Sequence, residues 1–292
     1  MKIVVRLGIY FVLAVGFLVA CTPLPKAELN AYARTFEAFE NVSNKVLDIV
    51  APYERAATRK TNYTTTDCPM DQPRVLSNDP FCHQIRDAFA TIGDPPLVKS
   101  YRNLISIIAR FNVIVIAYSN GVSLQFIKQD VDEFSNIVGV FGATATAEFT
   151  ELVDELTPLV QQSSNIRDRR ELQIFLTANF ETVEAAFQRM AIQSGALYTN
   201  VDTGTLRLIG EGGVNRKALE SRRRELRSIL ANWTVLIEET QDLLQGMEFA
   251  ISNPENLEVR IRNLAENSFE VFAGFEALNA QTAAIGTDGA FE

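Results

Sequence analysis

The sequence predicts an all-α protein, an elongated antiparallel helical bundle of five to six long helices with one small β-hairpin-like tip. The 15 Gly and 10 Pro together are 25 of 292 residues, or 8.6%, against about 12% in an average protein. A sandwich or barrel of strands normally needs more turn residues. Long stretches also place apolar residues three and four positions apart, which is typical of a helix that buries one face.

The first predicted helix covers residues 26–59, where apolar residues recur at helical spacing. Residues 60–81 follow, with prolines at 69, 73 and 80. Loops this long are uncommon inside compact domains and are often functional. A short helix is predicted over residues 82–92.

The next predicted helix begins at Pro95, with Asp94 as its N-cap, and ends at Asn120. It is apolar on nearly all sides, which alone would suit a membrane span. Because Arg110 and Asn112 interrupt it, we expect a central buried helix instead.

Residues 130–162 and 166–197 predict two further helices. Gly139 and Gly142 lie inside the first, where each is about 1 kcal/mol less favourable than Ala, so we expect either a close helix crossing or a kink. Residues 198–201 and 205–209 alternate apolar and polar side chains around Asp202-Thr203-Gly204. This pattern predicts a hairpin tip within residues 198–213.

The last two predicted helices, of which the first covers residues 214–251, are separated by Asn253-Pro254, a cap and a new start. In the final helix apolar positions and one serine form a heptad seam, made of Leu257, Ile261, Leu264, Ser268, Val271, Phe275 and Leu278. Short connections imply antiparallel neighbours. One domain over residues 26–280 is the simplest organisation, with two stacked bundles divided near 163–165 as the alternative and a frayed tail at 281–292.

The first twenty residues predict a leader, and residues 21–25 a short tether. Lys2 and Arg6 precede an apolar stretch over residues 7–20, which is too short for a comfortable membrane span. It ends in Leu18-Val19-Ala20-Cys21, which resembles the lipobox of bacterial lipoproteins. The resemblance implies that Cys21 carries a diacylglycerol and becomes the acylated N-terminus after cleavage. The alternative is an uncleaved anchor helix with an incidental cysteine.

The residue after Cys21 indicates in which bacterial membrane the protein is anchored. In the enterobacterial lipoproteins that this leader resembles, an aspartate there retains the protein at the inner membrane. This chain has Thr22, so the resemblance implies the outer membrane, with the domain facing the periplasm. Exposure on the cell surface stays open.

The net charge of the chain limits the classes of partner that it can bind. The 27 basic and 36 acidic residues give −9, which argues against nucleic acid. Loss of the leader's two cations leaves 25 against 36, or −11, so we expect a lipid and not surface charge to hold the protein at the membrane. The tether spans under about 20 Å.

The two remaining cysteines, Cys68 and Cys82, are expected to form a disulfide in an oxidising periplasm. It would close a loop of about 15 residues and stabilise the protein by roughly 3 kcal/mol. The alternative is two unpaired thiols.

The sequence predicts no catalytic residue, no metal site and no cofactor. His83 is the one histidine, which excludes most metal and acid–base machinery. Glu148, Glu151 and Glu155 share a helix face, and could serve a carboxylate-based hydrolase or a cation site. A solvated acidic face is the simpler interpretation.

We therefore expect a non-enzymatic protein-interaction or scaffolding module of the cell envelope, working through residues 60–81 and the hairpin tip. The candidate contacts with an envelope protein partner are Tyr63, Met70, Arg74, Asp202 and Arg207. The first alternative is a carrier of a lipid or other apolar ligand, because 17 of the 19 phenylalanines follow the leader and could line a cavity.

Two basic groups stand out in the sequence. Arg222, Arg223, Arg224 and Arg227 form the densest run, with Glu220 and Glu225 in reach for surface ion pairs of little energetic weight. If the last three helices are antiparallel, a second group meets at one end of the bundle and could contact lipid phosphates or an acidic partner. Its members are Arg167, Arg169, Arg170, Arg260 and Arg262. Solvated surface charge is again the simpler interpretation.

Overall fold

The all-α prediction is confirmed. The computed structural model describes residues 26–59, 93–210, 216–252 and 257–286, and over these ranges the chain forms helices and no strand. The elements are α2 (Lys26–Thr58), α4 (Pro96–Ser119), α5 (Leu124–Thr144), the 3-10 turn η4 (Ala147–Phe149), α6 (Thr150–Ser163), α7 (Arg169–Gly210), α8 (Arg216–Ser252) and α9 (Leu257–Gly286).

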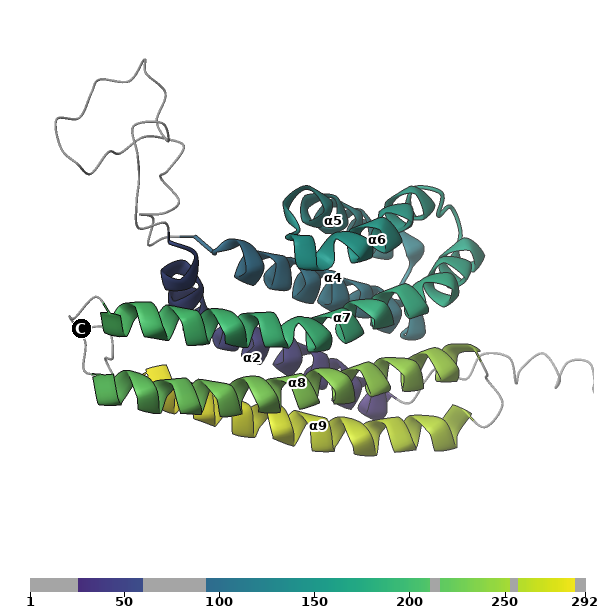
Figure 1. Ribbon diagram of the computed structural model, residues 1–292. Helices are drawn as coiled ribbons and strands as arrows, with labels where there is room; N and C mark the ends of the chain where they lie inside the picture. The colour runs from purple at the N-terminus through teal and green to yellow at the C-terminus, as the bar shows by residue number, and fades with distance from the viewer. Residues whose placement is uncertain (1–25, 60–92, 211–215, 253–256, 287–292) are drawn as a thin grey trace, which may run out of the picture.

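Four long helices, α2, α7, α8 and α9, lie side by side, and α4, α5 and α6 pack along one side of this group (Figure 1). Successive helices α7, α8 and α9 alternate in direction, but α2 runs parallel to both α7 and α9. Thr35 donates to the Ser268 carbonyl at 2.8 Å and Lys45 to Asn279 at 2.7 Å, so residue numbers in α2 and α9 rise together. The arrangement is therefore not purely antiparallel.

The predicted hairpin tip is wrong, because residues 198–210 continue α7. Val201 and Thr205, four apart, are buried on one helix face. Gly204 lies against α2, where a Cβ would be 2.8 Å from the Tyr53 carbonyl carbon and closer to its oxygen. The glycine that resembles a turn signal is needed for a close contact between two helices.

The helix predicted over residues 130–162 is two helices. The chain is extended at Ala145 and Thr146, with ψ of 141° and 170°, and the Thr146 N–H donates to Ser100 Oγ at 3.1 Å. Gly142 lies near α6, since its Cβ would be 3.5 Å from Val153. The break folds α6 back on α5 and buries Phe149.

Two predicted boundaries also shift. α4 begins at Pro96 with Pro95 as its N-cap, and the predicted cap, Asp94, pairs instead with Arg102 at 3.0 Å. α9 continues to Gly286, beyond the predicted domain end at 280, because its last turns bury Thr282 and Ile285.

The prediction that α4 is a central buried helix is confirmed. Twelve of its 24 residues are buried, and it packs against α2, α5 and α7. Among the described helices it is also the one whose length and apolar composition would suit a membrane span.

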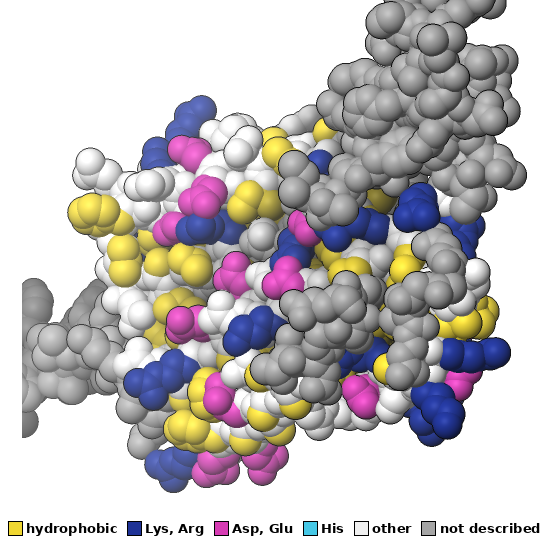
Figure 2. Space-filling model, turned by 90° about the vertical axis from the view of Figure 1, so that its left-hand side faces the viewer, with side chains coloured by type: hydrophobic (Ala, Val, Ile, Leu, Met, Phe, Trp, Pro, Cys, Tyr) yellow, Lys and Arg dark blue, Asp and Glu magenta, His cyan; other side chains and the backbone are white. Residues whose placement is uncertain are grey.

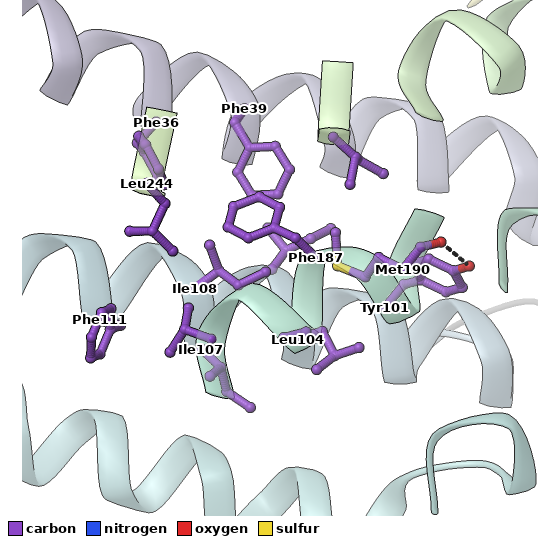
Figure 3. Close-up of a cluster of buried hydrophobic side chains, with 14 of the residues drawn as sticks. Phe36, Phe39, Tyr101, Leu104, Ile107, Ile108, Phe111, Phe187, Met190 and Leu244 are labelled. Carbon is purple, nitrogen blue, oxygen red and sulfur yellow. Dashed lines mark hydrogen bonds between the residues drawn. The ribbon is translucent and has the colours of Figure 1, made fainter. Parts of the chain in front are cut away.

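Aromatic side chains fill the centre of the fold (Figure 3). The rings of Phe39 and Phe187 lie 5.3 Å apart, centre to centre, and join α2 to α7. Tyr101 of α4 donates its hydroxyl to the Met190 carbonyl at 3.0 Å. Trp233 is fully buried and donates to Ser43 Oγ at 2.8 Å. These direct contacts are those of a packed core.

Candidate functional site

The structure describes some of the candidate residues and not others. Cys21, Tyr63, Cys68, Met70, Arg74, Cys82 and His83 lie outside the described ranges. Asp202, Arg207 and all five arginines of the second basic group lie inside them. The described candidates fall at the two ends of the long helices.

One end is formed by the last turns of α2, α7 and α9 and the first turns of α8 (Figure 1); we call it the Arg222 end. The last twelve residues of α2, α7 and α9, together with the first twelve of α8, carry eight Lys and Arg against six Asp and Glu, or +2. The opposite twelve-residue stretches carry six against seven, or −1. In a chain of net charge −9, the Arg222 end is locally basic.

Helix polarity gives a physical reason for these cations. Three helices finish at the Arg222 end. The last carbonyls of a helix have no hydrogen-bond partner within that helix, and the negative pole of the helix dipole lies there. Arg207 donates to the Ala56 carbonyl at 3.3 Å and to the Arg59 carbonyl, at the end of α2. Arg222, of which 8% is exposed, donates to the Ile285 carbonyl near the end of α9. These guanidinium groups cap helix C-termini.

Asp202, the other described candidate of the hairpin prediction, also has a structural partner. Its Oδ1 forms an ion pair with Arg223 Nε at 2.7 Å, which ties α7 to α8. A hydrogen bond with Tyr198 and the charge of Asp202 raise the pKa of Arg223 above its ordinary value. Arg227 lies over the Tyr198 ring, 5.9 Å from its centre.

The outer rim of the Arg222 end carries exposed arginines. Arg216, Arg224 and Arg227 are exposed, and Arg216 pairs along its own helix, with Glu220 at 3.1 Å. Figure 2 views this end and shows Lys and Arg side chains distributed around it, with Asp and Glu among them. Its exposed cations suit an anionic surface.

The other end is formed by the first turns of α2, α5, α7 and α9 and the last turns of α4 and α8; we call it the Arg169 end. It gathers all five arginines of the second basic group, since α7 and α9 both start there. Arg169 donates to the Tyr118 and Val122 carbonyls at 2.5 and 3.1 Å and so ties α7 to the end of α4. Arg260 lies 4.1 Å from the centre of the Phe249 ring.

The three carboxylates considered for a hydrolase are spread over two elements. Glu148 lies in η4, while Glu151 and Glu155 lie on α6, and all three are exposed. Glu151 pairs with Arg189 at 2.5 Å. Within the described ranges, no group of three His, Cys, Asp or Glu is placed to hold a metal ion. Their exposure favours the solvated-face interpretation.

A buried carboxylate was missed by the sequence reasoning. Glu54 is 1% exposed and accepts the N–H groups of Leu97 and Val98 at 2.7 and 2.9 Å. Burial raises its pKa, and these two hydrogen bonds oppose that rise. Its burial could have been inferred from the sequence, because Glu54 follows Val50 by four residues and so lies on the apolar face of α2. Glu54 caps the start of α4 from another helix.

Comparison with protein-family models, curated proteins and solved structures finds no match for this chain.

Proposed function

We propose that the protein is a non-enzymatic interaction or scaffolding module of the bacterial cell envelope. A lipid on Cys21 holds it at the outer membrane, facing the periplasm, and an envelope protein partner binds at the Arg222 end. The observation that carries the choice of surface is the charge of this end, +2 against −1 at the other.

The separation of the two ends supports this division of roles. α2 starts at Lys26, five residues after the proposed lipid attachment, and finishes at the Arg222 end. With 33 residues, at about 1.5 Å per residue, it spans about 50 Å. A partner at the Arg222 end would therefore meet the protein well away from the anchor.

The chemistry of the Arg222 end favours an acidic protein surface as the partner. Several of its arginines already satisfy helix carbonyls, so its fixed geometry does not depend on a partner. The exposed rim around Arg224 supplies further cations, and such cations mainly speed encounter with a surface of opposite charge and select against basic ones. Arg59 and Gly93 lie at this same end, and the candidates Tyr63, Met70 and Arg74 fall between them in the sequence.

A site-specific crosslinking experiment tests the surface. A photoreactive residue is placed at position 224, and the control is at position 239, which is exposed on the same helix. In intact envelopes we expect a discrete protein adduct from position 224 and none from 239. Equal patterns from the two positions would contradict the proposal.

A matched pair of charge reversals tests the role of charge. Arg224→Glu and Lys128→Glu both replace an exposed helical cation, at the Arg222 and Arg169 ends respectively. Arg224→Glu should weaken capture of the crosslinked partner by about tenfold, which equals about 1.4 kcal/mol. Lys128→Glu should leave it unchanged, and equal losses would argue against this surface.

The lipid anchor has a separate test. Intact mass spectrometry of the membrane-extracted protein should show a chain that begins at Cys21 and carries diacylglycerol. A chain that begins at Met1 without lipid would overturn the anchor. Incorporation of a labelled fatty acid should disappear in Cys21→Ala.

A further inference from the structure

The Arg169 end exposes large apolar side chains from four different helices. Phe126 is 73% exposed, Ile174 59%, Phe249 54% and Val259 59%. Each lies within two turns of the end of its helix: α5, α7, α8 and α9 respectively. Single exposed apolar residues are ordinary, but here four converge on one end.

The described residues of the Arg222 end show no comparable group of exposed apolar side chains. In the last three turns of α7 and the first three turns of α8, which the structure describes, Leu206 is the one exposed large apolar residue. The three exposed phenylalanines of the described ranges all lie nearer the Arg169 end, with Phe269 ten residues beyond Val259 along α9. A shallow groove lined by Ile166, Ile174 and Phe175 adds apolar surface between α6 and α7.

Arginines surround these apolar side chains. Arg260 stacks on Phe249, and exposed Arg167, Arg170 and Arg262 lie at the first turns of α7 and α9. Apolar rings beside guanidinium groups suit the boundary of a bilayer, where acyl chains and phosphates are within a few ångströms of each other.

The chain leading to α2 identifies what meets this surface. α2 begins at Lys26 at the Arg169 end, and four residues, 22–25, separate it from Cys21. Fully extended, they reach under about 20 Å. Given the lipid anchor of the proposed function, on which this inference rests, the Arg169 end is held within reach of the membrane.

We propose that the Arg169 end docks directly on the lipid bilayer. Phe126 and Phe249 enter the boundary between headgroups and acyl chains, and the surrounding arginines lie at the level of the phosphates. The lipid on Cys21 supplies the attachment, and the docked end fixes the orientation, so that the long helices stand away from the membrane and present the Arg222 end.

Tryptophan quenching by brominated lipids tests the docking. The full lipidated protein is reconstituted in vesicles of phosphatidylethanolamine and phosphatidylglycerol containing dibrominated phosphatidylcholine. Phe126→Trp and Phe249→Trp report on the Arg169 end. Phe269→Trp, about 15 Å further along α9, and Leu206→Trp at the Arg222 end are controls. Buried Trp233 gives the same background in every variant.

We expect the added fluorescence at positions 126 and 249 to fall by on the order of twofold in brominated vesicles, because the rings would lie within the quenched layer. Positions 206 and 269 should keep theirs. If all four positions stay unquenched in protein that floats with the vesicles, the docking proposal fails while the anchor stands.

Two further outcomes separate the proposals. Protein purified from membranes that lacks lipid and does not float with vesicles would overturn the anchor itself. Quenching at position 206 equal to that at 126 would mean that the protein lies flat on the bilayer, which contradicts docking by its end. As a second variant, Phe126→Ser with Phe249→Ser should increase cleavage by an added protease between Cys21 and Lys26, and unchanged cleavage would oppose the proposal.

Discussion

Gly204→Ala should separate the ends of α2 and α7. In the folded protein, a Cβ at this position would lie 2.8 Å from the Tyr53 carbonyl carbon and 2.9 Å from its Cα. These are backbone atoms, so no side-chain rotation relieves the contact. The two helices would have to move apart by about an ångström, in the turns that carry Arg207 to the end of α2.

Gly195→Ala on the same helix is the matched control. Nothing lies within 4 Å of the Cβ that it would add. Both substitutions improve helix propensity by about 1 kcal/mol, so their difference isolates the steric term. Overpacking against a well-packed partner typically costs about 1–3 kcal/mol, occasionally more. We expect Gly195→Ala to stabilise the protein slightly and Gly204→Ala to be about 3 kcal/mol less stable than this control.

Urea unfolding followed by far-ultraviolet circular dichroism measures this difference. At about 2–4 °C per kcal/mol for a domain of this size, thermal midpoints of the two variants should differ by about 6–12 °C. Hydrogen exchange should also speed up at residues 55–59 in Gly204→Ala, because Arg207 loses its carbonyl partners there. Equal stability of the two variants would refute the reasoning that this glycine is required by the contact with α2.

Three other perturbations have defined outcomes. Burial raises the pKa of Glu54 above 4.5, so its folded form binds the proton more tightly. The protonated Glu54 therefore stabilises the fold fully below pH 4.5, and this stabilisation is lost as the pH rises through the raised pKa. Above pH 4.5 the unfolding free energy of the wild type should fall relative to that of Glu54→Gln. A difference between the two proteins that does not vary with pH in urea titrations would contradict this. Ser43→Ala removes the acceptor of buried Trp233 and should lower unfolding free energy by about 1–3 kcal/mol, measured by thermal unfolding, and no change would argue against that hydrogen bond. Arg207→Ala should cost about 1 kcal/mol and speed hydrogen exchange in the last turn of α2, whereas Leu206→Ala should leave that exchange unchanged.

Local sequence signals placed the boundaries of α2, α4 and α8 within two residues. The helix predicted over residues 26–59 is observed as Lys26–Thr58, and that over 214–251 as Arg216–Ser252. The described members of the heptad seam, Leu264 to Leu278, are buried. These features depend on the spacing of apolar residues and on nearby Asn, Gly and Pro, all of which can be read within a few turns of chain.

The candidate site was less accessible to sequence reasoning. The sequence places Asp202 and Arg207 at an exposed tip, but in the structure they hold the ends of helices together. Their partners, Arg223 and Ala56, lie on other helices, one of them about 150 residues away along the chain. The sequence showed these residues to be polar and near a glycine, and a loop is the usual home for such a group.

The sequence by itself determined the helical class and the lengths of α2, α4 and α8, and it predicts the lipid attachment, because each of these follows from residues close together in the chain. Only the tertiary structure decided that Gly204 packs inside a helix, that α2 runs parallel to α7 and α9, and that Glu54 caps α4. The reason is physical: the free energy of each feature comes from atoms on a different helix, and no local pattern specifies which helices will meet.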